Sequence, residues 1–63
     1  PSPILLKVGS TGEAVKLVQE ALDLDADGVF GLMTEKVVKQ WQSDNSLTAD
    51  GIVGPKTYKV LVE

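Results

Sequence analysis

The six residues ADGVFG at positions 26–31 return as ADGIVG at positions 49–54, and this repetition decides the expected fold. Asp-Gly favours a tight turn, because glycine adopts positive φ without steric cost. The two apolar residues that follow are expected to fill the core beneath the loop. The second glycine of each copy suits a helix N-cap, and in the second copy Pro55 follows at a position that fits the first turn. Each copy therefore predicts a structured loop that leads into a helix.

The repetition continues on both sides of the motif at the same spacing of 23 residues. Among the superimposed pairs are Gln19 with Gln42, Thr34 with Thr57, Lys36 with Lys59, Val18 with Trp41, and Leu24 with Leu47. The two glutamines are expected to hydrogen bond the backbone of the loop that follows each of them. A period of this length is typical of helical repeat units. With only about two and a half copies, we expect a compact bundle rather than a solenoid.

Helical periodicity predicts three helices. The first starts near Ser10, where Ser10–Glu13 fits a capping box, and ends near residue 22 or 23. The second covers residues 32–43 and ends at Asn45-Ser46, with Asn45 able to take the left-handed conformation. The third covers residues 55 to 61 or 62. The fold class is all-α: a compact three-helix domain with two repeat-related Asp-Gly loops.

The chain of 63 residues predicts one small domain. Residues 1–5, which open with Pro-Ser-Pro, are interpreted as a linker or N-terminal packing segment, and residues 6–63 as the domain. The net charge of −3 and the lack of a basic run argue against nucleic-acid binding. No apolar run is long enough to span a membrane. We expect a monomer.

Histidine and cysteine are absent from the sequence. This composition excludes a zinc site built from these residues and a Ser/His or Cys/His nucleophilic arrangement. We expect no catalytic residues, no metal and no cofactor. A chain this short would also have difficulty building both a core and a desolvated cleft.

An acidic stretch before the first Asp-Gly turn resembles part of a calcium loop. Asp23, Asp25 and Asp27 alternate as calcium ligands do. Counted from Asp23, however, the twelfth position is Thr34 rather than the bidentate glutamate that such a loop needs. The second copy keeps the turn and has neutral residues at the first two acidic positions. Turn chemistry therefore accounts for the stretch better than calcium binding does.

The repeated motif and its neighbours resemble the peptidoglycan-binding-domain-1 family, whose members are non-catalytic modules of bacterial and phage cell-wall enzymes. The matching positions are Leu6, Gly9–Gly12, Val15, Val18, Gln19, Leu22, residues 27–31, Thr34, Val38, Trp41, Gln42, Leu47, residues 50–54 and Thr57. Val37 and Val60 depart from the family's usual alanine, and Ser46 from its frequent glycine. The same fold resembles the pro-segment of matrix metalloproteinases, which carry a cysteine that this chain lacks.

The resemblance implies attachment to peptidoglycan through its stem peptide or the glycan–peptide junction. It also implies a tethered catalytic domain of a wall hydrolase, peptidase or transpeptidase, acting in the cell envelope or outside the cell, or encoded by a phage. The binding module would raise the effective concentration of that enzyme at its substrate. Two alternatives stay open: a calcium-dependent or helical interaction module similar to a dockerin, and the pro-segment of a hydrolase.

The candidate ligand-binding residues are Tyr58, Asp27, Asp50, Leu32, Met33, Thr34, Gln42 and Trp41. Tyr58 is expected on the surface, because its repeat partners are not core residue types. Trp41 is expected to pack in the core and to line a groove with one edge. We place the site in a groove between Tyr58 and the exposed first turn of the second helix, at Leu32 and Met33.

Overall fold

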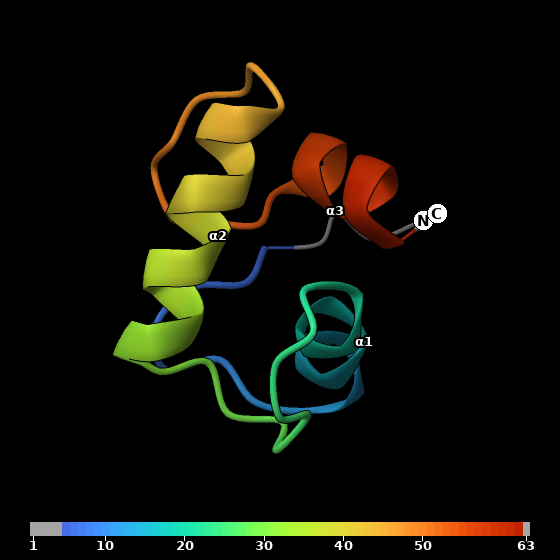
Figure 1. Cartoon of the computed structure of the whole chain (residues 1–63). Helices are drawn as coiled ribbons and strands as arrows, with labels where there is room; N and C mark the ends of the chain where they lie inside the picture. Colours follow the sequence, from blue (N-terminus) through green and yellow to red (C-terminus); the bar gives the residue numbers. More distant parts are fainter. Residues whose placement is uncertain (1–4, 63) are drawn as a thin grey trace.

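The computed structural model describes residues 5–62 and contains three helices. They are α1 (Glu13–Ala21), α2 (Leu32–Asp44) and α3 (Pro55–Val62), as Figure 1 shows. Across residues 5–62 the backbone forms isolated β-bridges but no strand. The prediction of a compact all-α domain with three helices is confirmed. None of these three helices is both long and apolar enough to cross a bilayer.

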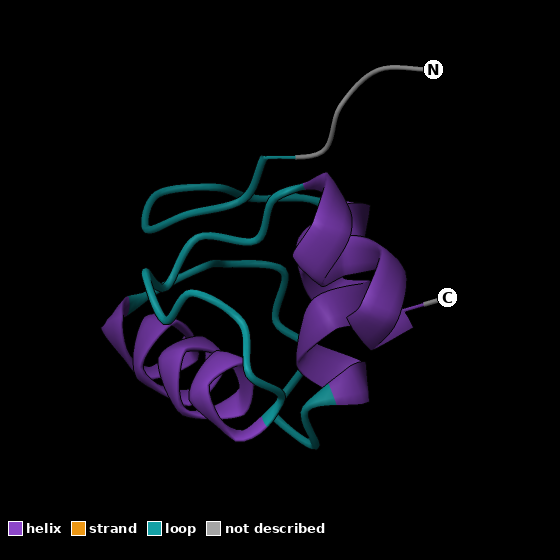
Figure 2. Cartoon of the chain, turned by 90° about the horizontal axis from the view of Figure 1, so that it is seen from above, coloured by secondary structure: helices purple, strands orange, loops and turns teal. Residues whose placement is uncertain are grey.

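The helices surround the connecting segments rather than packing as a parallel bundle. Helices α1 and α3 contact each other, and α2 lies on the opposite side. In both views the loops pass between α2 and the other two helices (Figures 1 and 2). The loops therefore contribute directly to the interior, as the apolar residues of the repeated motif predict.

The core consists of six buried apolar side chains drawn from every part of the described chain. They are Leu6, Val15, Val18, Phe30, Val38 and Val53. Phe30 and Val53 are the two repeat-related residues that were expected to lie beneath the loops, and both are fully buried. Because a side chain of this size contributes about 1.5–3 kcal/mol when fully buried, these loop residues stabilise the fold as much as helical ones do.

The N-terminal segment ties the two halves together through backbone hydrogen bonds. Leu6 and Val53 exchange two bonds, with N···O distances of 2.9 and 2.8 Å. Further along, the Gly9 N–H donates to Phe30 O, and the Phe30 N–H donates to Ser10 O, each at 2.9 Å. Leu6 is buried while Leu5 is exposed, and residues 1–4 of the predicted linker lie outside the described residues. The domain boundary at residue 6 stays a prediction.

The predicted capping box at Ser10 is wrong. Helix α1 begins at Glu13 with Gly12 as its N-cap, at φ 120° and without a side-chain cap. The Ser10 hydroxyl instead accepts a hydrogen bond from the Lys7 N–H at 3.0 Å. Because the backbone of Ser10 pairs with Phe30, the chain stays extended there and the helix begins two residues later.

The helix ends agree with the predicted ranges to within one or two residues, but the residue in the left-handed conformation differs. Ser46 has φ 60°, whereas Asn45 has φ −105° and donates its side-chain amide to Trp41 O at 2.8 Å. Asp23, the repeat partner of Ser46, has φ 61°. The prediction that Asn45 takes this conformation is wrong, because the turn needs it one residue later in both copies.

Candidate functional site: a groove between α1 and α2

Each loop is held by one buried glutamine from the preceding helix. Gln19, only 2% exposed, donates from Nε2 to Asp27 Oδ1 at 2.9 Å, Val29 O at 3.0 Å and Thr34 Oγ1 at 3.2 Å. Its Oε1 accepts a hydrogen bond from the Gly28 N–H at 3.0 Å. The predicted structural role of Gln19 is confirmed.

Gln42 repeats this arrangement in the second copy. It is 1% exposed and donates from Nε2 to Asp50 Oδ1 at 3.2 Å, Ile52 O at 2.9 Å and Thr57 Oγ1 at 3.3 Å. Its Oε1 accepts from the Gly51 N–H at 3.0 Å. Among the described residues, no buried side-chain nitrogen or oxygen lacks a hydrogen-bond partner. Gln42 and its repeat partner thus connect each helix to the next.

The two turn aspartates take part in the same networks. Asp27 Oδ1 accepts from the Val29 N–H at 2.9 Å, and Asp50 Oδ1 accepts from the Ile52 N–H at the same distance. The Val29 N–H, followed by the Gln19 amide, stabilises the carboxylate and lowers the pKa of Asp27 below its usual 3.8. Residues 5–62 contain no group of three His, Cys, Asp or Glu side chains that could hold a metal.

Thr34 and Gln42 are buried, so the structure gives both side chains a role inside the domain. The Thr34 hydroxyl accepts from Gln19, and the hydrogen-bonding atoms of Gln42 are occupied by its loop. Asp27 and Asp50 are exposed and also bond within their loops. Contact between any of these four side chains and a ligand stays a prediction.

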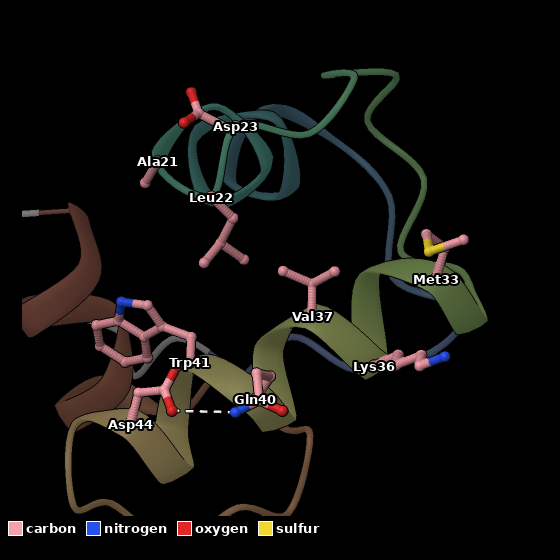
Figure 3. Close-up of a pocket in the computed structure, with 9 residues that line it drawn as sticks. All are labelled: Ala21, Leu22, Asp23, Met33, Lys36, Val37, Gln40, Trp41 and Asp44. Atoms are coloured by element: carbon pink, nitrogen blue, oxygen red, sulfur yellow. Dashed lines mark hydrogen bonds between the residues drawn. The ribbon is translucent and has the colours of Figure 1, made fainter.

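An open groove of about 540 Å³ lies between the C-terminal end of α1 and one face of α2. Its walls come from Ala21, Leu22, Asp23, Met33, Lys36, Val37, Gln40, Trp41 and Asp44. Figure 3 shows these side chains, with Ala21 and the two residues that follow α1 above and the α2 residues below. Positions 33, 37 and 41 and positions 36, 40 and 44 form two rows at a spacing of four, which keeps them on one side of the helix.

The floor of the groove is apolar. Leu22 points from the end of α1 toward Val37 and the indole of Trp41 on α2 (Figure 3). Trp41 is half-buried, so part of its ring stays open to the groove. Trp41 lines a groove as expected, but it belongs neither to the core nor to the side chains packed against it, so the prediction that it packs in the core is wrong. Such a floor suits a methyl group, an aliphatic chain or the face of a sugar.

The rim of the groove is polar and carries charge of both signs. Gln40 donates from Nε2 to Asp44 Oδ1 at 3.0 Å, which is the only hydrogen bond drawn among the lining side chains (Figure 3). Asp44 lies beside Trp41 at one end of the α2 face, whereas Lys36 lies beside Met33 at the other. Asp23 lines the α1 side. A ligand in the groove therefore meets carboxylates and an ammonium group at different places.

The structure does not bring Tyr58 to this groove. Tyr58 is half-buried and packs against the core, so the prediction that it is a surface residue is wrong. Helix α3 packs against α1, and Tyr58 contacts the core from α3. Leu32 is 75% exposed but does not line the groove, whereas Met33 and Trp41 do. The groove thus lies on the α1 side of α2 rather than toward α3.

Sequence reasoning did not identify Leu22, Lys36, Gln40 or Asp44 as lining residues. The signal that could have found them is the four-residue spacing along α2, which places Lys36, Gln40 and Asp44 in a row next to the apolar row that contains Trp41. Helix α1 supplies its share of the groove only through its last turn and the residues after it.

The family described as "Putative peptidoglycan binding domain" matches residues 11–61 of this chain. The chain belongs to this family. Among curated proteins, none matches the chain. Several solved structures do, and their similarity extends over nearly the whole of this peptidoglycan-binding-type domain.

Three solved structures illustrate the similarity. A fused Zn-dependent amidase/peptidase/peptidoglycan-binding domain-containing protein from Clostridium acetobutylicum is 33% identical, with a TM-score of 0.91, over 98% of this chain and 30% of its own. The endolysin of the Burkholderia phage AP3 is 36% identical, with a TM-score of 0.86, over 92% of this chain and 24% of its own. The SleB N-terminal domain is 33% identical, with a TM-score of 0.89, over 97% of this chain and 92% of its own. The chain thus spans less than a third of the amidase and of the endolysin.

Proposed function

We propose that this domain binds bacterial peptidoglycan as a monomer, catalyses no reaction itself, and holds an attached wall-processing enzyme at its substrate. Membership of the family supports wall binding. The similarity to parts of an amidase/peptidase and a phage endolysin supports attachment to a catalytic domain that acts on the cell wall, either in the cell envelope or delivered by a phage.

The observation that carries the proposal is the groove between α1 and α2. Its floor of Leu22, Val37 and Trp41 accepts apolar groups, while Lys36 and Asp44 on the rim accept groups of opposite charge. Peptidoglycan offers both kinds of group, since its stem peptides combine alanine methyl groups with charged residues. The stem peptide, or its junction with the glycan, is therefore the proposed ligand.

A weak binding site is sufficient for this function. Tethering converts the encounter between enzyme and wall into an intramolecular event, with effective concentrations in the millimolar range for a short flexible linker. An enzyme on an insoluble substrate then remains near uncut bonds after each turnover. The domain needs no catalytic group for this, and the chain has no histidine or cysteine to act as one.

The test is co-sedimentation of the purified domain with insoluble peptidoglycan, with cellulose as the control polymer. Lys36→Ala is the groove variant, and Lys59→Ala is its matched control, because Lys59 is the exposed repeat partner of Lys36 on α3 and lies outside the groove. We expect the domain and Lys59→Ala to pellet with the wall, and Lys36→Ala to pellet several-fold less.

The single tryptophan gives a second measurement, because Trp41 lines the groove. A soluble wall fragment should change its fluorescence. Pelleting that is equal for the two lysine variants, together with unchanged Trp41 emission, would place the binding surface elsewhere. Pelleting that disappears in a calcium chelator would instead favour a calcium-dependent module.

A further inference from the structure

We propose that the groove recognises the free side-chain ammonium of the diamino acid in an uncross-linked stem peptide, with Asp44 and Trp41 binding the ammonium and Lys36 binding a carboxylate of the same peptide. This inference rests on the proposed function and specifies the ligand of the same groove. It assigns the peptide portion of peptidoglycan, rather than the glycan, as the ligand of the groove.

The ammonium end of the groove is defined by two neighbouring side chains. Asp44 and Trp41 both line this end of the groove, and their spacing of three residues places them on the same side of α2. Gln40 donates to Asp44 Oδ1 and so fixes the carboxylate's orientation, while the two-oxygen carboxylate retains further acceptor sites. A cation between a carboxylate and an aromatic face is favoured by both, through charge attraction and the ring quadrupole.

Helix α2 adds to the negative potential at this end. Asp44 is the last residue of α2, and Leu22 and Asp23 follow the last residue of α1 directly. Helix C-termini carry partial negative charge, and neither of these two has a basic residue in its last turn. The C-terminal end of α2 thus adds to the negative charge of Asp44 at this end of the groove, and a ligand cation would complement it.

The opposite end carries the cation Lys36, beside Met33 (Figure 3). Lys36 and Asp44 are eight residues apart on α2, which corresponds to roughly 12 Å along the helix axis at 1.5 Å per residue. An extended peptide covers this distance with about three to four residues. A stem peptide of that length, with an ammonium at one end and a carboxylate at the other, fits the polarity of the groove and can lie over Val37.

A glycan strand fits these charges less well. Neutral N-acetylated sugars can stack on Trp41 but leave Asp44 and Lys36 partly desolvated without a charged partner, which costs free energy. An ammonium also occurs on glycan whose glucosamine has lost its acetyl group. The stem peptide and the deacetylated glycan thus both offer an ammonium group, so the experiment must distinguish between these two ligands.

The test uses three soluble probes and the whole domain, with Trp41 fluorescence and NMR shifts as readouts. The first probe is an uncross-linked disaccharide-tetrapeptide with a free diamino-acid amine, the second is the same compound acetylated on that amine, and the third is a peptide-free oligomer of deacetylated glucosamine. We expect acetylation to weaken binding at least tenfold and the third probe to bind no better than the second. Equal binding of the first two probes, or tighter binding of the third, would overturn the inference.

Charge-neutralising variants test whether the preference for the free amine over the acetylated amine arises in the groove. Asp44→Asn keeps an oxygen that can accept from Gln40, so it is expected to fold normally and to bind the free and acetylated probes with similar, weak affinity. Asp25→Asn is the matched control, since Asp25 is exposed and does not line the groove, and it should keep the tenfold preference. A preference retained by Asp44→Asn would overturn the assignment of the ammonium site.

Failure of this inference is distinguishable from failure of the proposed function. If the domain pellets with insoluble peptidoglycan but does not discriminate between the two peptide probes, the inference is refuted and wall binding stands. If the domain does not pellet at all, wall binding itself is refuted. If the inference holds, the domain prefers uncross-linked regions of the wall, because cross-linking converts the diamino-acid ammonium into an amide.

Discussion

Replacing Gln42 with leucine should lower the free energy of unfolding by about 4 kcal/mol. The two N–H groups of Nε2 are shared among three acceptors and Oε1 accepts one bond, so the side chain makes the equivalent of three hydrogen bonds, each worth roughly 1 kcal/mol net. Leucine has a similar size but leaves the Gly51 N–H without its acceptor, and an unpaired buried donor costs about 1–3 kcal/mol. The apolar surface that leucine buries offsets part of this loss.

That loss is large relative to the whole stability of such a domain. At about 0.05–0.15 kcal/mol per residue, a chain of 63 residues has roughly 3–9 kcal/mol. Gln42→Leu should therefore remove between half and all of the stability. Urea denaturation followed by far-UV circular dichroism and by Trp41 fluorescence measures this as a fall in the midpoint at unchanged slope.

Gln40→Leu is the control on the same helix. Gln40 is exposed and makes one exposed hydrogen bond, so its replacement should change the free energy of unfolding by no more than about 0.5 kcal/mol. A loss below about 1 kcal/mol for Gln42→Leu, measured beside this control, would contradict the reasoning. It would mean that apolar packing alone holds the second loop against α2 and α3.

The remaining predictions concern the first loop. Gln19→Leu should cost within about 1 kcal/mol of Gln42→Leu in the same urea titration, because the two side chains make equivalent bonds, and a much smaller cost would show that the repeats differ in energy. Phe30→Ala should cost about 3–5 kcal/mol through the cavity that it leaves, and a cooperative thermal transition near that of the parent chain would contradict this. Because hydrogen bonds lower the pKa of Asp27 in the folded state, its contribution is complete above the usual value of 3.8 and is lost as the pH falls through the lowered value. Asp27→Asn should therefore flatten the fall in melting temperature as the pH drops through and below 3.8, and an unchanged profile would assign that fall to other carboxylates.

The repeated elements were the most predictable part of the fold. Phe30 and Val53 occupy equivalent places in the two copies, and both are buried as the repeat implies. The role of Gln19 and Gln42 could also be predicted, because an amide placed before each loop supplies both a donor and an acceptor to the backbone. Repetition made these inferences strong, since each residue was observed in two equivalent contexts.

Features that depend on contacts distant in the sequence were not predictable. Ser10 has the local signature of an N-cap, yet its backbone pairs with Phe30 and the helix starts at Glu13. Tyr58 has exposed residue types as repeat partners, yet it packs against the core from α3, which contacts α1. In both cases tertiary contact overrides a local signal.

The groove was predicted only in part. Trp41 and Met33 could be named from the character of their side chains, and both line it. The charged rim could not, because the end of α1 faces Lys36 and Asp44 only once the loop at residues 24–31 has folded back. Which surface a helix exposes depends on the angle at which its neighbour crosses it, and the local sequence does not specify that angle.

The glutamine networks also determine the order in which the domain can open. Gln19 connects α1 to Thr34 of α2, and Gln42 connects α2 to Thr57 of α3, so of the three helices only α2 belongs to both networks. Fraying of α1 or α3 breaks one network and leaves the other, whereas α2 can separate only when both are lost. The hydrogen-bonded amide protons in the middle of α2 should thus exchange with solvent only through global unfolding. We therefore expect α2, which carries most of the groove, to be the last of the three helices to unfold.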